Sequence, residues 1–368
     1  MHKHNISLFI ILLCSLLLVT ACEGPISSTI SSTATTNNHN NTSNSAIGSF
    51  REYSLPQTGS GIMRPAIDSK GRLWFGEMSR NFLTMFDPHT QTFEQIVPPH
   101  GAYSIMGILA APDDTIWFAE QDANYIGHYF PTTQRFQTYN LPTLHTPDPS
   151  NAKNILTLPS GPNDIAFDVH GNLWFTEMNA DSLGMLNTQT GVIKQYPLSR
   201  MKSVQTLSPY GITIDAHGMV WFTESASNRV GRLDPHTGAI HLFTIASTSP
   251  VPLMEIASDI HGIIWATSFN ANQLLRLDPA TGVFTSYTAP SATQGSGGLY
   301  GLVITTNNEI WVTVPAENTL ARFDTTTNHF IYHAIPSPSS FPFGLVVDAS
   351  HNIWFTESSS DKIGMLQQ

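Results

Sequence analysis

Five glutamates recur at one position of a repeated segment and could together bind a cation. Each ends a short run that contains Trp, such as LWFTE at 173–177 or IWFTE at 353–357. Carboxylate oxygens are the ligands that Ca²⁺ and Mg²⁺ prefer. On a circular arrangement the carboxylates could face one rim and hold either cation; alternatively, each bonds the backbone N–H groups of a neighbouring turn. The five are Glu77, Glu120, Glu177, Glu224 and Glu357.

The runs that carry these glutamates belong to a sevenfold repeat. All seven Trp residues occupy one position of the repeat, at intervals of 43 to 57 residues: Trp74, Trp117, Trp174, Trp221, Trp265, Trp311 and Trp354. A Trp confined to one register of a ~40–50-residue period is typical of a β-propeller blade. Asn or Asp follows seven residues after every Trp, and these residues tolerate the left-handed backbone of a hairpin turn.

The two ends of the repeat array complement each other. The last unit stops at Gln368 after its third expected strand, whereas residues 49–56 (SFREYSLP) form an unpaired fourth strand before the first unit. Pairing them closes a ring and leaves no exposed sheet edge. The sequence therefore predicts an all-β, seven-bladed propeller over residues 48–368, with four-stranded blades and the N-terminal strand completing the last blade. The longest Trp interval predicts an inserted loop near residues 143–160.

The first 47 residues predict export and anchoring. An apolar run over residues 6–19 follows Lys3 and is too short to span a bilayer, as in a signal peptide. The residues before Cys22 (Val-Thr-Ala) resemble a bacterial lipobox, which implies cleavage after residue 21 and acylation of Cys22; an ordinary signal peptide is the alternative. Residues 22–47 are rich in Ser, Thr and Asn and predict a flexible tether. We expect a lipid-anchored protein on the extracytoplasmic side of the bacterial membrane.

Charge limits the class of partner. The net charge is −11 with only 16 Lys and Arg residues, and no basic stripe is present. This composition argues against a nucleic-acid partner. We expect a monomer that meets a small-molecule ligand or an extracellular protein, in addition to the membrane that holds its lipid anchor.

The repeat resembles one known family of propellers. Its units combine a Pro-x-Gly-Ile turn, Gly-x-Leu-Trp-Phe-Thr-Glu and Asn-x-Ile-Gly-Arg, most closely in SPYGITIDAHGMVWFTESASNRVGRLD at 208–234. This pattern, over all seven units, resembles the virginiamycin B lyase (streptogramin B lyase) family. The resemblance implies a seven-bladed propeller that opens a cyclic depsipeptide antibiotic by elimination at an ester, with a base and Mg²⁺.

The positions to which the resemblance assigns catalysis carry other residues. The sixth- and seventh-blade His positions fall on Tyr300 and Phe343, the Glu before the latter falls on Phe341, and the first-blade Tyr falls on Pro65. Because Tyr titrates at ~10 and Phe does not titrate, neither replaces imidazole as a base near pH 7. We therefore expect the family's mechanism to be absent. The candidates left for acid–base catalysis are Glu357, Tyr300 and Tyr210.

The turns expected around the central channel also contain candidate ligand-binding residues. Aromatic rings with a few polar groups are typical of a small-molecule pocket, although the same rings could plug the channel. Asp164 and Glu255 could also hold a cation. Three functions remain open: a binding lipoprotein, a divergent Mg²⁺-dependent lyase, and a lactonase-like metal-dependent hydrolase. The candidate ligand-binding residues are Asn163, Asp164, Tyr210, Glu255, Tyr300, Phe341 and Phe343.

Overall fold

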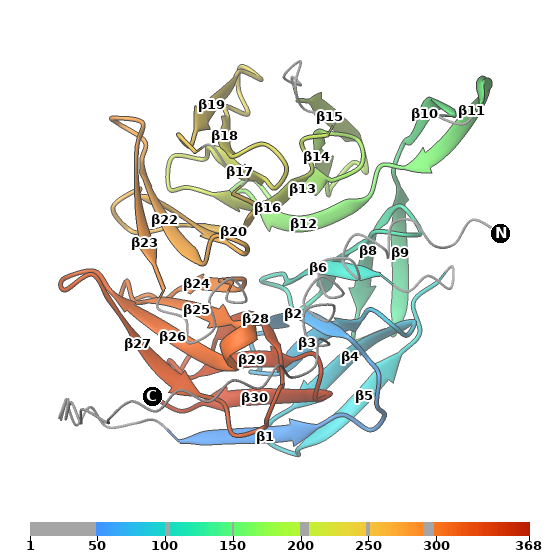
Figure 1. The fold of residues 1–368 in the computed structure, drawn as a ribbon. Coiled ribbons are helices and arrows are strands. Elements are labelled where there is room, and N and C mark those ends of the chain that lie inside the picture. Colours follow the sequence, from blue (N-terminus) through green and yellow to red (C-terminus); the bar gives the residue numbers. More distant parts are fainter. Residues whose placement is uncertain (1–48, 100–103, 149–150, 199–205, 248–250, 290–297) are drawn as a thin grey trace, which may run out of the picture. The chain divides into compact units, whose positions relative to one another are not determined.

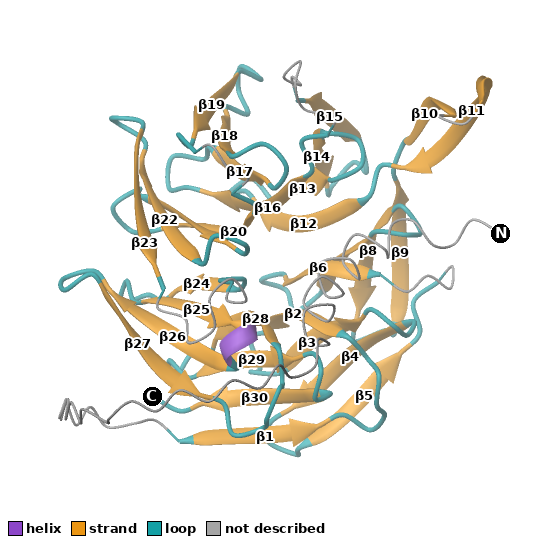
Figure 2. Ribbon diagram, viewed as in Figure 1, coloured by secondary structure: helices purple, strands orange, loops and turns teal. Residues whose placement is uncertain are grey.

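Strands make up almost all of the regular structure (Figures 1 and 2). The computed structural model describes residues 49–99, 104–148, 151–198, 206–247, 251–289 and 298–368. Residues Gly48–Gln368 form one compact unit. The signal peptide, Cys22 and tether expected in residues 1–47 lie outside the described residues. In the described ranges the only helix is the 3₁₀ turn η1 (Pro315–Glu317), and no helix there is long and apolar enough to cross a membrane.

Seven antiparallel four-stranded sheets form the blades, numbered here along the chain. The strands of each blade are given from the innermost outward. Blade 1 consists of β2 (Ile62–Ile67), β3 (Leu73–Glu77), β4 (Phe82–Asp87) and β5 (Thr92–Ile96), and blade 2 of β6 (Ile105–Ala110), β7 (Ile116–Glu120), β8 (Tyr125–Phe130) and β9 (Arg135–Asn140). Blade 3 consists of β12 (Pro162–Phe167), β13 (Asn172–Glu177), β14 (Ser182–Asn187) and β15 (Ile193–Pro197), and blade 4 of β16 (Pro209–Ile214), β17 (Val220–Glu224), β18 (Arg229–Leu233) and β19 (Ile240–Thr244). Blade 5 consists of β20 (Leu253–Ser258), β21 (Ile264–Ser268), β22 (Gln273–Asp278) and β23 (Val283–Thr288). Blade 6 consists of β24 (Leu302–Ile304), β25 (Ile310–Val314), β26 (Thr319–Asp324) and β27 (His329–Ala334). Blade 7 consists of β28 (Pro342–Val347), β29 (Ile353–Glu357), β30 (Lys362–Leu366) and β1 (Phe50–Ser54).

The N-terminal strand closes the ring, as the sequence predicts. β1 pairs antiparallel with β30, from Phe50 opposite Leu366 to Ser54 opposite Lys362. Each innermost strand contacts the innermost strand of the next blade, and β28 contacts β2 to complete the circle (Figure 1). The Tyr53 ring lies 6.0 Å from Trp354 and 4.8 Å from Phe86, so β1 also joins the cores of blades 7 and 1.

A buried hydrogen bond explains why Trp is confined to one register. In five blades the Trp Nε1 atom donates to the Oδ2 atom of an Asp six residues earlier, at 2.7–3.0 Å. The other Asp oxygen accepts backbone N–H groups of the turn between the first two strands, as Asp168 does from His170 and Asn172. The indole therefore fills the space between blades with its polar atom satisfied. The five acceptors are Asp68, Asp168, Asp215, Asp259 and Asp348.

The recurrent Asn and Asp residues connect neighbouring blades. Six of them have the predicted left-handed backbone, with φ of 48–60°. In all but Asn272 the side-chain oxygen then accepts backbone N–H groups from the loop that enters the next blade. Asp361 accepts from Gly59 and Ser60 at 2.8 Å, and Asn318 accepts from Ser340 at 2.7 Å. One turn residue thus ends a hairpin and fixes the adjacent blade. The six are Asn124, Asp181, Asn228, Asn272, Asn318 and Asp361.

The insertion before blade 3 is a hairpin, whereas the sequence analysis expected a loop. β10 (Thr143–Asp148) pairs with β11 (Asn151–Pro159) in a separate two-stranded sheet, which extends away from the blades in Figure 1. Alternating β-branched and apolar residues in NILTLP provide the strand pattern that the loop interpretation overlooked.

Candidate functional site

The residues that line the centre of the ring lie at a break in strand pairing. In six blades the register between the first two strands skips two residues, for example between Pro162 and Ile165 or between Leu253 and Ile256. The skipped residues are released from their own ladder and approach the next blade. We call the two-residue segments at this break, together with Tyr300 and Gly301 of blade 6, the hub. They are 63–64, 106–107, 163–164, 210–211, 254–255, 300–301 and 343–344.

This register corrects the alignment of the first blade. Pro65 was predicted at the hub position, two residues before Ile67, by analogy with the Gly-Ile turns of the other units. Pro65 instead pairs with Phe75, as Ile165 pairs with Phe175. Met63 therefore occupies the hub position to which the resemblance assigns a Tyr. Arg64, which the sequence analysis missed, is the equivalent of Asp164 and Glu255.

Only three blades place a side chain at the second hub position. The other four have Gly, because a Cβ atom would meet the neighbouring backbone: at Gly211 it would lie 2.5 Å from the Met254 carbonyl oxygen. At Gly301 it would lie 2.2 Å from the Phe343 carbonyl oxygen. The remaining side chains, Arg64, Asp164 and Glu255, come from alternate blades of that part of the ring and converge.

The three charged side chains form a buried ion cluster. Arg64 Nη2 lies 2.7 Å from Glu255 Oε1, and Arg64 Nε donates to the same oxygen at 2.9 Å. Asp164 Oδ1 lies 3.8 Å from Arg64 Nε, and the Asp164 carboxylate also accepts the backbone N–H groups of Ile165 and Ile212. The side chains are only 10–13% exposed. Among the described residues Arg64 Nη1 has no hydrogen-bond partner.

Aromatic rings surround the cluster. The hydroxyl groups of Tyr210 and Tyr300 share a hydrogen bond, and the Arg64 guanidinium lies 5.1 Å from the Tyr210 ring centre. Phe343 packs edge-on against Tyr300 at 4.6 Å, and Phe341 packs edge-on against Phe343 at 5.0 Å. These contacts connect the aromatic rings with one another and with Arg64.

Six of the seven predicted ligand-binding residues therefore belong to one connected cluster: Asp164, Tyr210, Glu255, Tyr300, Phe341 and Phe343. The seventh, Asn163, bonds the backbone of the cluster. Its Nδ2 atom donates to the Tyr210 carbonyl oxygen at 3.0 Å, and it is fully buried. Whether these residues bind a ligand stays a prediction.

Burial and charge compete in setting the ionisation of the cluster. Burial lowers the pKa of Arg64, but the carboxylates of Glu255 and Asp164 outweigh it and raise that pKa well above its ordinary value. Burial raises the pKa of Glu255 and of Asp164, although Arg64 opposes the rise at both. One cation thus faces two carboxyl groups that are easier to protonate than usual, a setting suited to proton transfer near neutral pH.

Threonines of the second strands hold the hub in place. Thr223 Oγ1 accepts the Gly211 N–H of its own blade and donates to the Met254 carbonyl oxygen of the next blade at 2.7 Å. Thr176, Thr267, Thr313 and Thr356 make the same pair of bonds. The Thr two residues after the Trp in these five blades therefore fixes the spacing of the hub side chains.

The five recurrent glutamates are kept apart by their own blades. Glu177 accepts from Gln195 at 2.7 and 2.9 Å, and Glu224 is ion-paired with Arg229 at 2.5 Å. Glu77 accepts from Thr84 and Gln95, and Glu120 accepts the Ser104 N–H. Among the described residues no three His, Cys, Asp or Glu side chains are grouped so that they could hold a metal ion. The donor set therefore does not fit the Ca²⁺ or Mg²⁺ that the sequence analysis considered.

Glu357, the remaining catalytic candidate, is fully buried opposite Pro342, one strand outward from the hub. Burial, together with the nearby Glu52 carboxylate, raises the pKa of Glu357 to about 7. Glu357 lies beside Ser337 and Ser340 of the loop that enters blade 7 and is not part of the connected cluster of hub side chains.

Comparisons with known proteins agree with this architecture. A model described as the Virginiamycin B lyase family matches residues 144–368, more than half of the chain. A streptogramin B lyase structure has a TM-score of 0.75 and 25% identity, covering 87% of this chain and 98% of that one. No curated protein matches the sequence.

Two structures of virginiamycin B lyase from Staphylococcus aureus show the same fold. One has a TM-score of 0.74 and 24% identity, covering 87% of this chain and 99% of that one. The other, a catalytically inactive variant with quinupristin, has a TM-score of 0.72 and 24% identity, covering 87% of this chain and 100% of that one. Given the family match, this seven-bladed chain belongs to the virginiamycin B lyase family.

Proposed function

We propose that this protein binds a small molecule at the hub and does not carry out the elimination reaction of its family. The observation that carries the proposal is the buried Arg64, whose Nη1 atom lacks a hydrogen-bond partner among the described residues. A buried donor of this kind gains free energy from an acceptor that a ligand brings. The sequence adds support, since Tyr300, Phe343 and Phe341 stand where the resemblance places the family's His and Glu residues.

The ligand chemistry follows from the neighbours of Arg64. A carbonyl or carboxylate oxygen would meet the guanidinium, and an apolar or aromatic group would meet Phe341 and Phe343. Phe341 has a left-handed φ of 52° at a position where blades 1 and 3 have Gly61 and Gly161. A bulky residue in this region costs about 1 kcal/mol or more, and such strain is concentrated at binding sites. Its retention here is consistent with a role for the ring.

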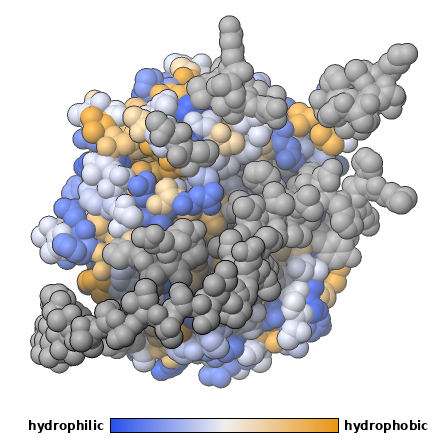
Figure 3. All heavy atoms as spheres, in the orientation of Figure 1, coloured by the Kyte–Doolittle hydropathy of each residue, from blue (hydrophilic) through white to orange (hydrophobic). Residues whose placement is uncertain are grey.

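A small molecule fits the surface better than a protein partner. Hydrophilic and apolar residues are interspersed on the face shown in Figure 3. The exposed large hydrophobic residues of the described ranges lie in separate parts of the chain and include Val97, Val169, Ile260 and Tyr332. Single exposed apolar residues do not make an interface. We further propose a monomer, tethered outside the bacterial cytoplasmic membrane through acylated Cys22, that has no nucleic-acid partner and meets its ligand in the cell envelope.

Incubation with quinupristin tests both parts of the proposal. Mass spectrometry should show an unchanged ring after incubation with excess protein and Mg²⁺, while thermal unfolding should show stabilisation of the wild type by the compound. Arg64→Gln should lose this stabilisation, and Arg135→Gln, at an exposed position of β9, should retain it. A linearised product would overturn the absence of lyase activity. Equal stabilisation of both variants would overturn binding at the hub.

A divergent lyase is the second candidate, and one observation favours it. Glu255 combines a raised pKa with a guanidinium at 2.7 Å. A base beside a fixed positive charge is what removal of a proton next to an ester carbonyl requires. If quinupristin is linearised, Glu255→Gln should abolish the reaction while leaving thermal stabilisation by the compound. Turnover that survives this change would exclude Glu255 as the base.

A further inference from the structure

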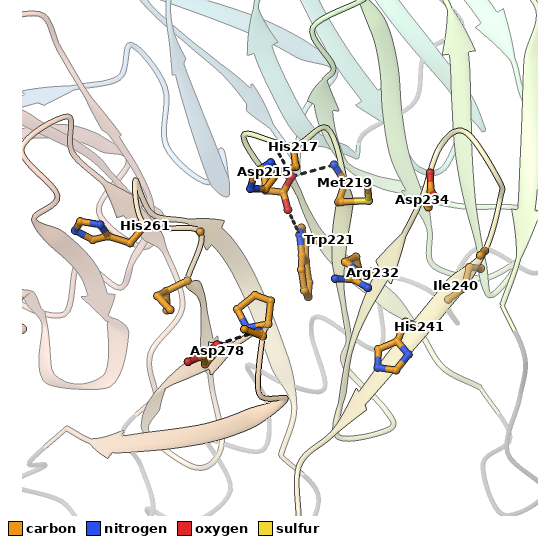
Figure 4. Close-up of a pocket in the computed structure, with 15 residues that line it drawn as sticks. Asp215, His217, Met219, Trp221, Arg232, Asp234, Ile240, His241, His261 and Asp278 are labelled. Atoms are coloured by element: carbon orange, nitrogen blue, oxygen red, sulfur yellow. Dashed lines mark hydrogen bonds between the residues drawn. The ribbon is translucent and has the colours of Figure 1, made fainter.

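A cavity of about 680 Å³ opens between blades 4 and 5, and no hub residue lines it (Figure 4). One wall comes from β17, β18 and β19 and includes Trp221, Arg232 and His241. The other wall comes from blade 5 and includes His261, Asp278 and Pro279. Sites for small ligands have volumes of roughly 300–1,000 Å³. We call this cavity the blade 4–5 groove.

One wall of the groove presents a cation without a counter-ion. Trp221, Arg232 and His241 lie directly opposite one another on adjacent strands, and so share one face of blade 4. The Arg232 guanidinium lies 5.6 Å from the Trp221 ring centre (Figure 4). Within the described ranges the Arg232 side chain forms no hydrogen bond and no ion pair. By contrast, Arg322 at the same position of blade 6 is paired with Glu309 at 2.5 Å.

Met219 explains the difference between the two arginines. Glu309 lies two residues before Trp311, and the residue two before Trp221 is Met219. Met219 also lines the groove. The apolar Met219 side chain therefore lies where blade 6 has the Glu309 carboxylate, and the Arg232 guanidinium is available to a ligand.

The carboxylates of the groove differ in how far they are already bonded. Both Asp215 oxygens are occupied, Oδ2 by Trp221 Nε1 at 2.7 Å and Oδ1 by the His217 and Met219 N–H groups. Both Asp234 oxygens are occupied by the turn that follows them. Asp278 Oδ1 accepts the Ala280 N–H at 2.9 Å, whereas Oδ2 accepts no hydrogen bond from the described residues. Asp278 lies on the wall that faces Arg232 (Figure 4).

The geometry points to a site for a small zwitterion, such as an amino acid or a short peptide. The ligand carboxylate would pair with Arg232, its ammonium group would pair with Asp278 Oδ2, and its carbon atoms would lie along Trp221 and Pro279. A simple anion would meet three carboxylates in the groove, and a simple cation would meet the uncompensated Arg232. A ligand with both charges satisfies the two free groups together. The site is independent of the hub and of the function proposed for it.

Saturation-transfer NMR titrations of the full chain with three dipeptides test this inference. Glycylglycine carries both charges, N-acetyl-glycylglycine lacks the ammonium, and glycylglycinamide lacks the carboxylate. Glycylglycine should give a saturable signal, and each blocked peptide should bind about fivefold or more weakly. Absence of a saturable signal from glycylglycine, or equal affinity for the three peptides, would overturn the proposal.

Variants assign the two charges to their partners. Arg232→Gln should weaken glycylglycine binding about fivefold but leave the affinity for glycylglycinamide unchanged, because this peptide has no carboxylate to pair with Arg232. Asp278→Asn should weaken the binding of glycylglycine but not that of N-acetyl-glycylglycine. The amide oxygen of the Asn can still accept the Ala280 N–H. Arg276→Gln in blade 5 and Asp87→Asn in blade 1, at the positions equivalent to Arg232 and Asp278, are the matched controls. An effect of either control as large as that of its test variant would place the ligand elsewhere.

Discussion

Arg64 and Glu255 form an ion pair at 2.7 Å although they are 191 residues apart in the chain. They lie in blades 1 and 5, which are not neighbours, so the pair crosses the centre of the ring. Asp164 of blade 3 adds a second carboxylate. The ion pair therefore connects two blades that share no strand contacts, and both of its side chains are largely buried. Breaking a buried ion pair is costly because it leaves an uncompensated charge.

Replacement of Arg64 should destabilise the protein in a pH-dependent way. Arg64→Gln should lower the free energy of unfolding by about 3 kcal/mol at pH 8 and by less at pH 5. Without Arg64, burial raises the pKa of Glu255 and Asp164 unopposed, so the folded state binds more protons than the unfolded state and loses stability as pH rises. Urea unfolding at the two pH values measures the difference. The exposed Arg135→Gln is the control, and an Arg64→Gln loss that is equal at both pH values would contradict this account.

A missing hydrogen bond in blade 6 offers a gain of stability. Trp311 Nε1 is buried and has no partner among the residues that the structure describes, because Thr305 replaces the Asp that accepts this bond in five other blades. Thr305→Asp should supply the acceptor and raise the free energy of unfolding by about 1 kcal/mol. Asp168→Ala in blade 3 should lower it by a similar amount or more. Thermal unfolding of the two variants provides the measurement, and destabilisation by Thr305→Asp would contradict the role assigned to the Asp.

The Trp and Asn positions also show how much the sequence could predict. Seven equally placed Trp residues and an unpaired strand at 49–56 sufficed for the fold and its closure, because both depend on a local pattern repeated along the chain. Arg64 was missed through alignment on Ile67. Counting nine residues back from Trp74 gives Pro65, which would have placed Arg64 beside Asp164 and Glu255 in the repeat.

The partners of the recurrent glutamates could not be predicted in the same way. Glu177 bonds Gln195 of its fourth strand, whereas Glu224 bonds Arg229 of its third. The residues that neutralise or accept these carboxylates differ from blade to blade and follow from packing within each blade. The five glutamates occupy equivalent positions of the repeat, but each carboxylate has its own surroundings within its blade.

Loss of the closing strand should cost far more than loss of the longer β10–β11 hairpin. Deletion of residues 49–56 removes the β1–β30 ladder and the Tyr53 contacts with Trp354 and Phe86, and should lower stability by several kcal/mol. Replacement of residues 144–158 by a two-residue linker removes only strands that pair with each other, and should leave the melting temperature within a few degrees. Similar melting temperatures for the two deletions would refute closure by β1.

Glu120 should make the protein less stable as pH rises, and its amide should remove that dependence. Burial raises the pKa of Glu120 from 4.5 to about 8. The folded state therefore keeps a proton that the unfolded state has lost, so the stability from this group is complete below pH 4.5 and declines as pH rises towards 8. Glu120→Gln mimics the protonated form and keeps an acceptor for the Ser104 N–H.

The difference in unfolding free energy between Glu120→Gln and wild type isolates this group from every other titrating residue. It should be under about 1 kcal/mol at pH 5 and favour the variant by about 4–5 kcal/mol at pH 8.5, since the pKa rises from 4.5 to about 8 and each pKa unit corresponds to about 1.4 kcal/mol. Glu94→Gln, at an exposed position of β5, is the matched control and should show no such trend. A Glu120→Gln variant that is less stable than wild type by the same amount at both pH values would mean that the carboxylate is ionised in the folded blade.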